Sequence, residues 1–262
     1  MAEPEKSPSL NELSHFALSL ADLAAPMAMR WFRRKLDVEH KADLSPVTAA
    51  DREIEAAIRQ RIARAWPDHG IFGEEHGQDN PDSDHVWVID PIDGTRSFIT
   101  GMPTFGTLIA HLVGGRPVLG VVAMPATGER WLGVAGRPTL FDGAPCHSSG
   151  RRLGEARLYA TSPDIFDEAG RAAFERVSAR ALMRRFGGDC YAYGLLAAGH
   201  VDAVVEMGLH PYDYMALVPV IEGAGGVITD WQGAPLTLAS SGHVLASANP
   251  ALHEEILPLL SG

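Results

Sequence analysis

Helical periodicity dominates the first part of the chain. Large apolar residues recur three or four positions apart at Leu13, Phe16, Leu20, Leu23, Met27 and Trp31. Because one face of an α-helix repeats about every 3.6 residues, this spacing predicts an amphipathic helix from Leu10 to about Arg34. Pro26 is expected to kink this helix, since proline lacks the backbone N–H that an interior position needs.

A second amphipathic helix is expected after a loop at residues 43–46. Its apolar face consists of Ile54, Ala57, Ile58 and Ile62. The helix is predicted to end near Trp66 and Pro67. Asp51 falls in its first turn.

The middle of the chain changes to short runs of β-branched and aromatic residues. Val86–Ile89 is predicted to form a buried strand. Three further runs, separated by Gly-Gly, Pro and Thr-Gly, cover residues 108–112, 118–123 and 130–134. Such runs with turn residues between them are typical of an antiparallel meander.

Strand-like and helix-like segments alternate in the second half. Strands are predicted at residues 158–162, 201–206, 227–229 and 243–247, and helices at residues 167–180, 189–198, 215–222 and 250–260. Pro138–Gly154 is rich in Gly, Pro and Ser, which predicts a boundary near Gly150 between two subdomains, 1–150 and 151–262. The alternation predicts a layered α/β protein.

Composition narrows the functions open to this chain. With 262 residues, 46% of them hydrophobic, it can bury a substantial core. The formal net charge of -11 argues against nucleic-acid and anionic-membrane partners, which need clustered Lys and Arg. No signal-like N-terminus occurs, and Cys146 and Cys190 lie far apart. We therefore expect a cytoplasmic protein without a disulfide framework or a zinc site.

An acidic hexapeptide, Asp90-Pro91-Ile92-Asp93-Gly94-Thr95, follows the predicted strand 86–89. It lies at the C-terminal end of that strand, where sheet-based active sites usually open. Two close carboxylates repel each other unless a cation lies between them, and oxygen ligands suit Mg²⁺, Mn²⁺ and Ca²⁺. Taken alone, however, such a motif is more often a solvated acidic turn.

Three further segments change this interpretation. They are Lys41–Asp51, Gly73-Glu74-Glu75 and His210-Pro211-Tyr212-Asp213-Tyr214. Together with the hexapeptide, and over most of the chain from about Leu10, they resemble the inositol monophosphatase-like family of Mg²⁺-dependent phosphatases. Residues 96–110, 187–191 and 211–214 look most like the branch that dephosphorylates histidinol phosphate. The resemblance implies a five-layered α-β-α-β-α sandwich of the inositol monophosphatase and fructose-1,6-bisphosphatase type, and a homodimer.

The resemblance also implies two to three Mg²⁺ ions per site, with Mn²⁺ as a substitute. Glu74, Asp90 and the carbonyl of Ile92 match the ligands of the first ion, and Asp90, Asp93 and Asp213 match those of the second. Asp51 and Glu74 would share a third site, partly through water. In such an arrangement the metal lowers the pKa of the attacking water.

Thr95 matches the family threonine that hydrogen-bonds this water, with Asp51 as its carboxylate partner. Glu74, Thr95 and Asp51 are therefore the expected catalytic residues. Without the family, Thr95 is equally well interpreted as a helix N-cap. Gly94 and Thr95 can also offer backbone N–H groups to phosphate oxygens.

Substrate binding is expected to involve Asp93, Gly94, Thr95, Arg96, Arg185, Asp189, Glu206 and Asp213. Glu206 matches the carboxylate that contacts the polar substrate moiety in relatives that use inositol phosphate. Asp189 is an additional carboxylate that would favour the cationic histidinol phosphate, or else a helix N-cap after two glycines. Arg96 and Arg185 would reach the phosphate or pair with acidic neighbours.

Two charged neighbours of these motifs have alternative interpretations. Lys41 would either lie in a mobile loop over the metals, as the resemblance suggests, or be a solvated surface lysine. Glu75 has no ligand position in the family pattern, so we expect it to support Glu74 or to face solvent.

The sequence thus predicts a Mg²⁺-dependent phosphatase that hydrolyses L-histidinol phosphate by direct attack of metal-activated water. The alternatives are phosphatases for inositol phosphate, fructose 1,6-bisphosphate or 3′-phosphoadenosine 5′-phosphate, and a non-catalytic regulatory protein with the same fold. The eleven histidines include no HExxH motif, and the chain has no P-loop or nucleophile elbow. Zinc hydrolase, kinase and covalent serine chemistry are therefore not expected.

Overall fold

The computed structural model describes residues 8–34, 38–40 and 46–261. Lys41 and most of the predicted loop at 43–46 lie outside the described residues. The helices are α1 (Leu10–Trp31), α2 (Ala49–Ala65), α3 (Thr95–Thr100), α4 (Glu168–Ser178), α5 (Asp189–Ala197), α6 (Pro211–Tyr214), α7 (Leu217–Gly223) and α8 (Pro250–Ser261), with short 3-10 turns at Leu153–Glu155 and Pro163–Ile165.

The larger sheet has eight strands in the order β10-β9-β8-β7-β6-β5-β3-β4. They are β3 (Gly70–Gly73), β4 (Gly77–Asp79), β5 (His85–Asp93), β6 (Gly106–Val113), β7 (Arg116–Met124), β8 (Glu129–Val134), β9 (Leu140–Phe141) and β10 (Ala144–Pro145). The meander β6-β7-β8 is antiparallel, as predicted. The pair β3 and β5 is parallel, so Glu74, which follows β3, and Asp90, near the end of β5, lie at the same end of two neighbouring strands.

The smaller sheet has five strands in the order β12-β11-β13-β15-β14. They are β11 (Arg157–Ala160), β12 (Met183–Phe186), β13 (Ala203–Glu206), β14 (Val227–Thr229) and β15 (Val244–Ser247). A separate pair joins β1 (Val38–His40) to β2 (Pro46–Thr48). The pattern missed β12, because all four of its residues are exposed on a sheet edge and show no alternation of burial.

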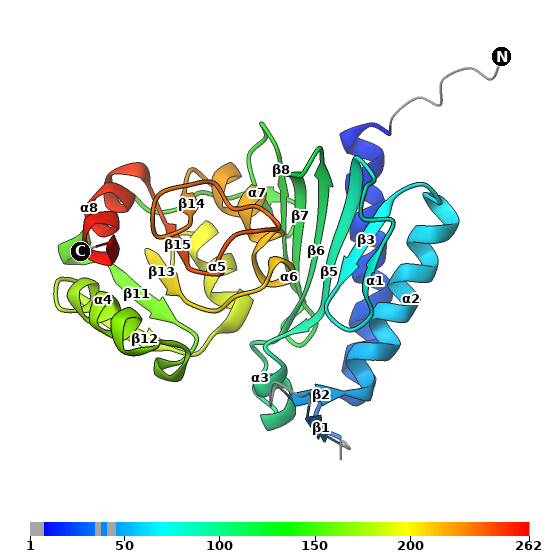
Figure 1. Cartoon of the computed structure of the whole chain (residues 1–262), viewed down its shortest axis with the longest axis horizontal. Helices are drawn as coiled ribbons and strands as arrows, with labels where there is room; N and C mark the ends of the chain where they lie inside the picture. The colour runs from blue at the N-terminus through cyan, green and yellow to red at the C-terminus, as the bar shows by residue number, and fades with distance from the viewer. Residues whose placement is uncertain (1–7, 35–37, 41–45, 262) are drawn as a thin grey trace.

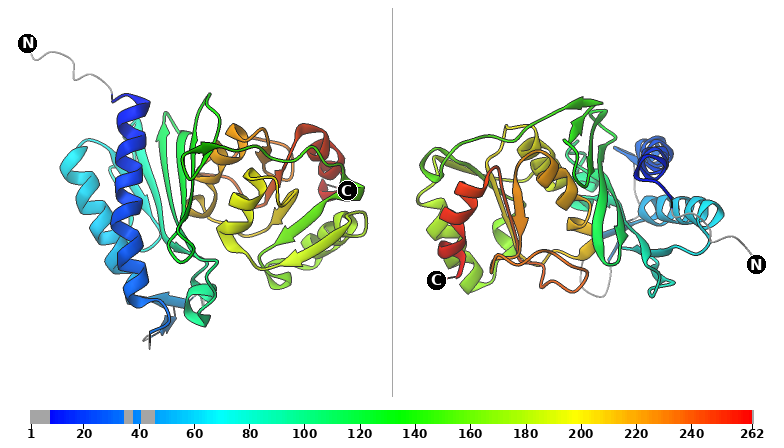
Figure 2. Two further views of the ribbon diagram at one scale, coloured as in Figure 1. Left: turned by 180° about the vertical axis from the view of Figure 1, so that it is seen from behind. Right: turned by 90° about the horizontal axis from the view of Figure 1, so that it is seen from above.

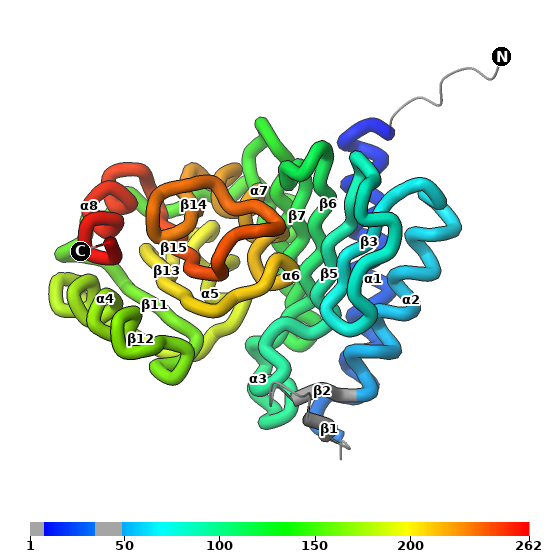
Figure 3. Tube along the Cα trace, viewed as in Figure 1, coloured from blue at the N-terminus to red at the C-terminus, as the bar shows by residue number. Residues whose placement is uncertain are grey.

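The molecule has five layers in the order α-β-α-β-α (Figure 1). Helices α1 and α2 cover the outer face of the large sheet, and α5, α6 and α7 lie between the two sheets. The tube in Figure 3 shows α4 and α8 together at the opposite end from α1 and α2. Figure 2 shows the crossing from the large sheet to the small one, between β10 and β11. The predicted layered α/β fold is confirmed.

Two hydrophobic clusters follow from this layering. One joins α1 and α2 to the large sheet through residues such as Leu20, Ile54 and Trp87. The other joins the inner face of the large sheet to the small sheet and its helices. The middle helices thus pack on both sheets, which fixes loops at the carboxyl end of β5 against the second half of the chain.

Several predicted boundaries are corrected. The helix expected at 215–222 is α7, which begins two residues later at Leu217, and the short helix α6 before it was not expected. Pro219 is tolerated because it lies in the first turn of α7, where N–H groups have no helical acceptor. Helix α1 continues past Pro26 and ends at Trp31. Strand β5 extends beyond Ile89 to Asp93, with a register shift between Asp90 and Asp93. Within the described residues, no helix combines the length and apolarity needed to cross a membrane.

Candidate functional site

Three carboxylates meet between the two sheets. Asp90 and Asp93 lie on the irregular end of β5, and Asp213 comes from α6. One ligand oxygen from each of the three lies within 4.8 Å of the others. Glu74 follows β3, whose last residue pairs with Ile89, and the backbone N–H of Glu74 donates to the carbonyl of Ile89 over 3.3 Å. The fold therefore brings together acids that are far apart in the sequence.

Helix N-termini hold two of these carboxylates. The backbone N–H of Cys190, in the first turn of α5, donates to Asp93 Oδ2 over 2.6 Å. The backbone N–H of His210, before α6, donates to Asp213 Oδ2 over 2.6 Å. Each acid thus has one oxygen fixed by the protein.

Burial, and after it the charges of the neighbouring acids, raise the pKa of the carboxylates in this cluster. Burial is the largest cause of the high pKa of Asp90, followed by the charges of Glu74, Asp93, Asp213 and Asp51. Burial and then the charge of Asp189 raise the pKa of Asp93 to about 7. The pKa of Asp213 is also raised well above its usual range, chiefly by burial and then by Asp93. Such a cluster is fully ionised at neutral pH only if a cation compensates it.

The cluster fits a hard divalent cation. Asp90 is 2% exposed, and its Oδ1 has no hydrogen-bond partner among the described residues. A buried carboxylate oxygen without a donor is costly unless an ion or water binds it. Since all the donors are oxygens, Mg²⁺ or Mn²⁺ suits the set better than Zn²⁺. Asp90, Asp93 and Asp213 can therefore hold a metal ion.

Glu55 on α2 holds the turn that carries Glu74. Its side chain is fully buried and accepts the backbone N–H groups of Glu75 (2.7 Å) and His76 (3.1 Å). Arg59 donates its Nε–H to the same carboxylate over 2.7 Å. A Cβ at Gly73 would lie 2.1 Å from Glu55 Oε1, so only glycine allows this approach. Glu75 Oε2 lies 3.6 Å from Arg52 Nε, and its side chain is 3% exposed, so Glu75 does not face solvent.

A cleft of about 470 Å³ opens beside the acids. Its lining comprises Glu74, Asp93, Gly94, Thr95, Arg96, Ser97, Thr161, Ser162, Ile165, Gly187, Asp189, Glu206, Met207, Gly208, Leu209 and Asp213. These residues come from both halves of the chain, from the ends of strands and from the loops and helices that follow them, so the cleft exists only when the two halves pack together. Four expected site residues are not in its lining. Asp51, Asp90 and Ile92 are buried behind it, at 1%, 2% and 0% exposure, and Arg185 is exposed on β12.

The N-cap interpretation of Thr95 is wrong. Gly94 is the N-cap of α3, with φ of 80°, and Thr95 is the first helical residue. A positive φ favours glycine, which leaves the Thr95 side chain free of the capping position. Its Oγ1 donates to the carbonyl of Ile92 over 3.2 Å. The hydroxyl and that carbonyl therefore lie together beside the acids.

The N-cap interpretation of Asp189 is also wrong, because Gly188 occupies that position in α5. Asp189 Oδ2 accepts hydrogen bonds from Ser97 (2.6 Å) and Thr104 (3.0 Å), which tie α5 to the segment after β5. Arg96 lies on the rim of the cleft and is exposed.

Glu206 ends β13 and faces the cleft while it is 2% exposed. Its Oε1 accepts from the backbone N–H and the hydroxyl of Thr161, over 2.7 and 2.8 Å. Its Oε2 has no hydrogen-bond partner among the described residues. Burial raises the pKa of Glu206 to about 8. This carboxylate can accept a donor from a bound molecule.

The sequence analysis did not identify Glu55, Thr161 or Ser162. Glu55 lies on the buried face of α2 beside Ile58, and a charged residue at an apolar helical position is a usable signal. Thr161 and Ser162 are the last two residues of the strand predicted at 158–162, but β11 ends at Ala160, so they follow the strand, where active sites open in α/β sheets. Their distance in sequence from the acidic motifs concealed the connection.

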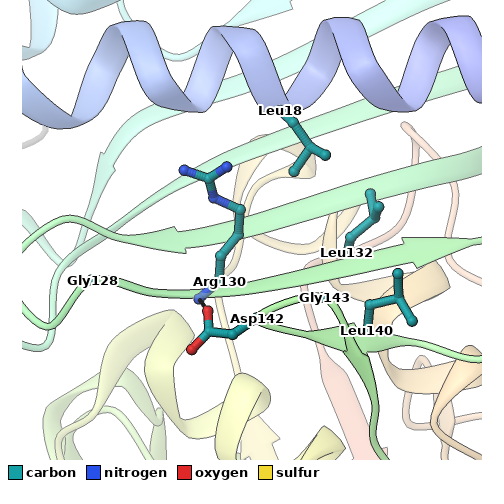
Figure 4. Close-up of a pocket in the computed structure, with 7 residues that line it drawn as sticks. All are labelled: Leu18, Gly128, Arg130, Leu132, Leu140, Asp142 and Gly143. Carbon is teal, nitrogen blue, oxygen red and sulfur yellow. Dashed lines mark hydrogen bonds between the residues drawn. The ribbon is translucent and has the colours of Figure 1, made fainter.

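A smaller hollow of about 320 Å³ lies between α1 and the strands β8 and β9 (Figure 4). Leu18, Leu132 and Leu140 line it, and the backbone N–H of Arg130 donates to Asp142 over 2.9 Å. It holds no cluster of acids or nucleophiles. The acidic cleft is therefore the candidate functional site.

Comparison with known proteins agrees with this assignment. Residues 9–262 match the model of the inositol monophosphatase family. The chain is 46% identical to the bifunctional phosphatase IMPL2, chloroplastic, of Arabidopsis thaliana, over 95% of this chain and 76% of the relative. It is 36% identical to a histidinol-phosphatase of Chlorobaculum parvum, over 92% of this chain and 93% of the relative.

Solved structures show the same fold. An inositol monophosphatase from Zymomonas mobilis superposes with a TM-score of 0.89 at 45% identity, over 97% of this chain and 100% of that one. The family match over residues 9–262 includes both sheets and all four motifs. The chain belongs to the inositol monophosphatase family.

Proposed function

We propose that this protein is a Mg²⁺-dependent phosphomonoesterase that hydrolyses L-histidinol phosphate to L-histidinol and phosphate. The observation that carries the proposal is the meeting of Asp90, Asp93 and Asp213, whose ligand oxygens lie within 4.8 Å of one another beside a cleft that also contains Glu206. The three aspartates support phosphate chemistry through a bound metal. Glu206 in the cleft supports an amine-bearing substrate.

The metal part of the proposal assigns Asp90, Asp93 and Asp213 to one ion and Glu74, Asp90 and the Ile92 carbonyl to another. Asp51 is proposed for a third site with Glu74. When bound, Mg²⁺ would neutralise the phosphate and lower the pKa of a water molecule. Because the chain carries a net charge of -11, a phosphate ester would otherwise be repelled.

The residues of the chain would then position the reactants. The Thr95 hydroxyl lies 3.2 Å from the Ile92 carbonyl and can hydrogen-bond a nearby water. A threonine hydroxyl is too weak a base to act alone, so a carboxylate such as Asp51 or Glu74 must accept the proton that the water loses. Gly94 and Arg96 line the same wall and are proposed to contact the phosphate.

Substrate choice is argued from Glu206 and Asp189. Glu206 is buried with a pKa of about 8 and one oxygen without a partner among the described residues. A cation against it would lower that pKa and recover the cost of burial, whereas a neutral polyol would only donate hydrogen bonds. L-Histidinol carries an amine and an imidazole, both of which can be protonated and pair with the Glu206 carboxylate. Asp189 adds negative charge, while the exposed Arg185 on β12 is a weaker candidate.

The decisive experiment measures phosphate release from L-histidinol phosphate and inositol 1-phosphate, with and without Mg²⁺. We expect Mg²⁺-dependent release that is at least about 10-fold faster, as kcat/KM, with histidinol phosphate. Glu206→Gln should remove most of this preference, and Asp93→Asn should lower turnover of both substrates by at least about 100-fold. Equal or reversed rates for the two substrates would refute the substrate, and full activity of Asp93→Asn would refute the metal assignment.

One second candidate has specific support. The Zymomonas mobilis structure at 45% identity is described as an inositol monophosphatase, so inositol phosphate is the alternative substrate. A relative with another kind of name, a Nus factor SuhB of Pasteurella multocida, is 32% identical over 95% of this chain, so a non-catalytic regulatory role is the other alternative. Metal-dependent phosphate release distinguishes an enzyme from such a protein. A homodimer and a cytoplasmic location are proposed from the family resemblance and the composition.

A further inference from the structure

Three histidines gather at the end of the large sheet opposite the acidic cleft. His69 precedes β3, His85 begins β5 and His111 lies on β6. His111 faces the same side of the sheet as Trp87, its partner in the β5–β6 register. One ring nitrogen from each histidine lies within 4.8 Å of the others. His85 and Asp93 stand at the two ends of β5, which at about 3.3 Å per residue separates the groups by roughly 25 Å.

This cluster contains polar atoms that the protein does not satisfy. His111 is 0% exposed, and neither of its ring nitrogens has a hydrogen-bond partner in the described part of the chain. The Nδ1 of His85 is buried and also lacks a partner there. An imidazole normally needs one donor and one acceptor, so these nitrogens require an explanation.

Burial keeps two of the three rings, His69 and His111, in the neutral form that binds metals. Burial and then the charge of His85 lower the pKa of His69 to about 4. Burial and then the charges of His69 and His85 lower the pKa of His111 to about 3. At neutral pH both rings are therefore uncharged and each has one nitrogen with a lone pair, which in His69 accepts from Trp87.

We propose that His69, His85 and His111 form a second metal site, separate from the acidic cleft, for a transition-metal ion of the Zn²⁺, Ni²⁺ or Cu²⁺ class. Neutral imidazoles prefer these ions to Mg²⁺, which takes oxygen ligands. Three histidines are also a known ligand number for Zn²⁺, with the fourth position left to water. The spacing of His69, His85 and His111 in the sequence does not predict this site, because the three residues come from different segments.

Binding requires a local rearrangement. His69 and His85 stack with their centroids 4.7 Å apart and their planes at 10°, so the two lone pairs do not converge on one point. The Nε1–H of Trp87 also donates to Nδ1 of His69 over 3.1 Å. At least one ring must turn, and His69 must either release Trp87 or change tautomer. His85, which begins its strand and is half-buried, is less enclosed than His111 and is the ring we expect to turn.

The aromatic surroundings make this rearrangement observable. Trp66 stacks on His69 at 5.1 Å and Trp87 lies 4.6 Å from His111, measured between ring centroids. A metal that turns these rings or frees the Trp87 indole will therefore change tryptophan fluorescence. A metal bound only at the acidic cleft leaves both indoles in place.

The test titrates Zn²⁺ into the full chain in excess Mg²⁺, and follows bound zinc by equilibrium dialysis and tryptophan fluorescence. We expect one Zn²⁺ per chain with a fluorescence change, retained in Asp93→Asn. His111→Phe, which keeps an aromatic ring in the core, should weaken binding at least 10-fold and abolish the fluorescence change. His85→Asn, at a less buried position, should do the same if the His111 variant fails to fold.

The matched control is His200→Gln, at an exposed histidine remote from the cluster, which should bind as the wild type does. No zinc uptake by the wild type would overturn the proposal. Zinc uptake unchanged by the cluster variants, or lost in Asp93→Asn, would overturn it equally, because the ion would then lie elsewhere. None of these outcomes depends on phosphatase activity, so the proposed function is tested separately.

Discussion

Buried carboxylates in this protein differ in what compensates their charge. Asp202 is 0% exposed, but Arg157 donates to it from Nε (2.7 Å) and from its backbone N–H (2.8 Å). Although burial acts to raise its pKa, these hydrogen bonds hold the pKa of Asp202 below its usual value. Asp90 is buried just as deeply, and its pKa is raised by burial and by four acidic neighbours. The protein supplies the counter-charge in the first case and leaves it to a bound cation in the second.

Glu55 provides a test of how a single side chain positions another. In Glu55→Gln the amide can replace only one carboxylate oxygen as an acceptor, while the backbone N–H groups of Glu75 and His76 and the Arg59 guanidinium all donate. We expect the turn that carries Glu74 to loosen and the apparent Mg²⁺ affinity to fall by about 10-fold or more. Turnover should be largely recovered at saturating Mg²⁺.

Calorimetric titration of Mg²⁺ and the Mg²⁺ dependence of activity measure this effect. Glu53→Gln is the control, because Glu53 lies on the same helix but pairs with Arg30 at the surface. An exposed ion pair is worth at most about 1 kcal/mol, so this variant should bind Mg²⁺ normally. Equal Mg²⁺ affinity in the two variants would show that Glu55 does not position Glu74.

At the scale of elements, the site depends on how helices begin. Helix α3 starts at Gly94 in a left-handed conformation, and α5 starts at Gly188 in another. These two starts bring Asp93, Thr95 and Asp189 together, since the α5 terminus donates to Asp93 and Asp189 accepts from Ser97 on α3. Glycine is required at Gly94 for conformation and for space.

Gly94→Ala should damage both stability and activity. The alanine backbone would have to adopt φ of 80°, and its Cβ would lie 2.7 Å from Asp189 Cγ. Left-handed strain alone costs about 1–2 kcal/mol, which lowers Tm by roughly 2–8 °C in a protein of this size. Gly136→Ala isolates this strain, because φ is 73° there and nothing lies within 4 Å. We expect both variants to melt earlier in a thermal scan, Gly94→Ala more so, and only Gly94→Ala to lose kcat/KM.

Helix α8 makes the stability of the small sheet depend on pH. His253 on α8 contacts Ser247 from Nδ1 (3.1 Å) and Thr229 from Nε2 (2.9 Å). Burial lowers its pKa from 6.5 to about 4. Between these values the unfolded chain binds a proton that the folded chain does not, so stability falls as pH decreases from about 6.5 toward 4.

Urea unfolding at pH 7 and pH 5 measures this contribution. His253→Gln should lose less stability over that interval than the wild type, since its side chain does not titrate. His200→Gln, at an exposed position, should behave as the wild type does. An unchanged pH dependence in His253→Gln would mean that folding does not lower the pKa of His253.

At the scale of the whole molecule, the candidate site joins the two halves of the chain. Glu74, Asp90 and Asp93 come from the large sheet, while Asp189, Glu206 and Asp213 come from the second half. The two-subdomain boundary near Gly150 remains a prediction. The chain does cross between sheets in that region, but one hydrophobic cluster includes residues from Val86 to Leu260.

Mg²⁺ should therefore stabilise the whole molecule. An ion that binds only the folded state raises the free energy of unfolding by about 2.7 kcal/mol at 100 times its Kd. Thermal scans with EDTA and with Mg²⁺ should show a higher Tm with Mg²⁺, and a smaller shift at pH 6 than at pH 8, because protons compete for Asp93, whose pKa is about 7.

Asp213→Asn should abolish most of the Mg²⁺-induced shift, since it removes the ligand that the second half contributes. Asp82→Asn, at an exposed loop position, should retain the full shift. A Tm that does not respond to Mg²⁺ in the wild type would contradict binding of Mg²⁺ across the two halves.

The sequence by itself determined the layered α/β class, the meander and the segments that carry the acids, because these depend on local periodicity and on motifs read in order. Tertiary structure decided what those segments touch. It brought Asp213 to Asp90, put Glu55 under the Glu74 turn, and made Gly94 rather than Thr95 the N-cap. It also left Arg185 on an exposed edge. Each of these depends on packing between residues distant along the chain, which periodicity along the sequence does not encode.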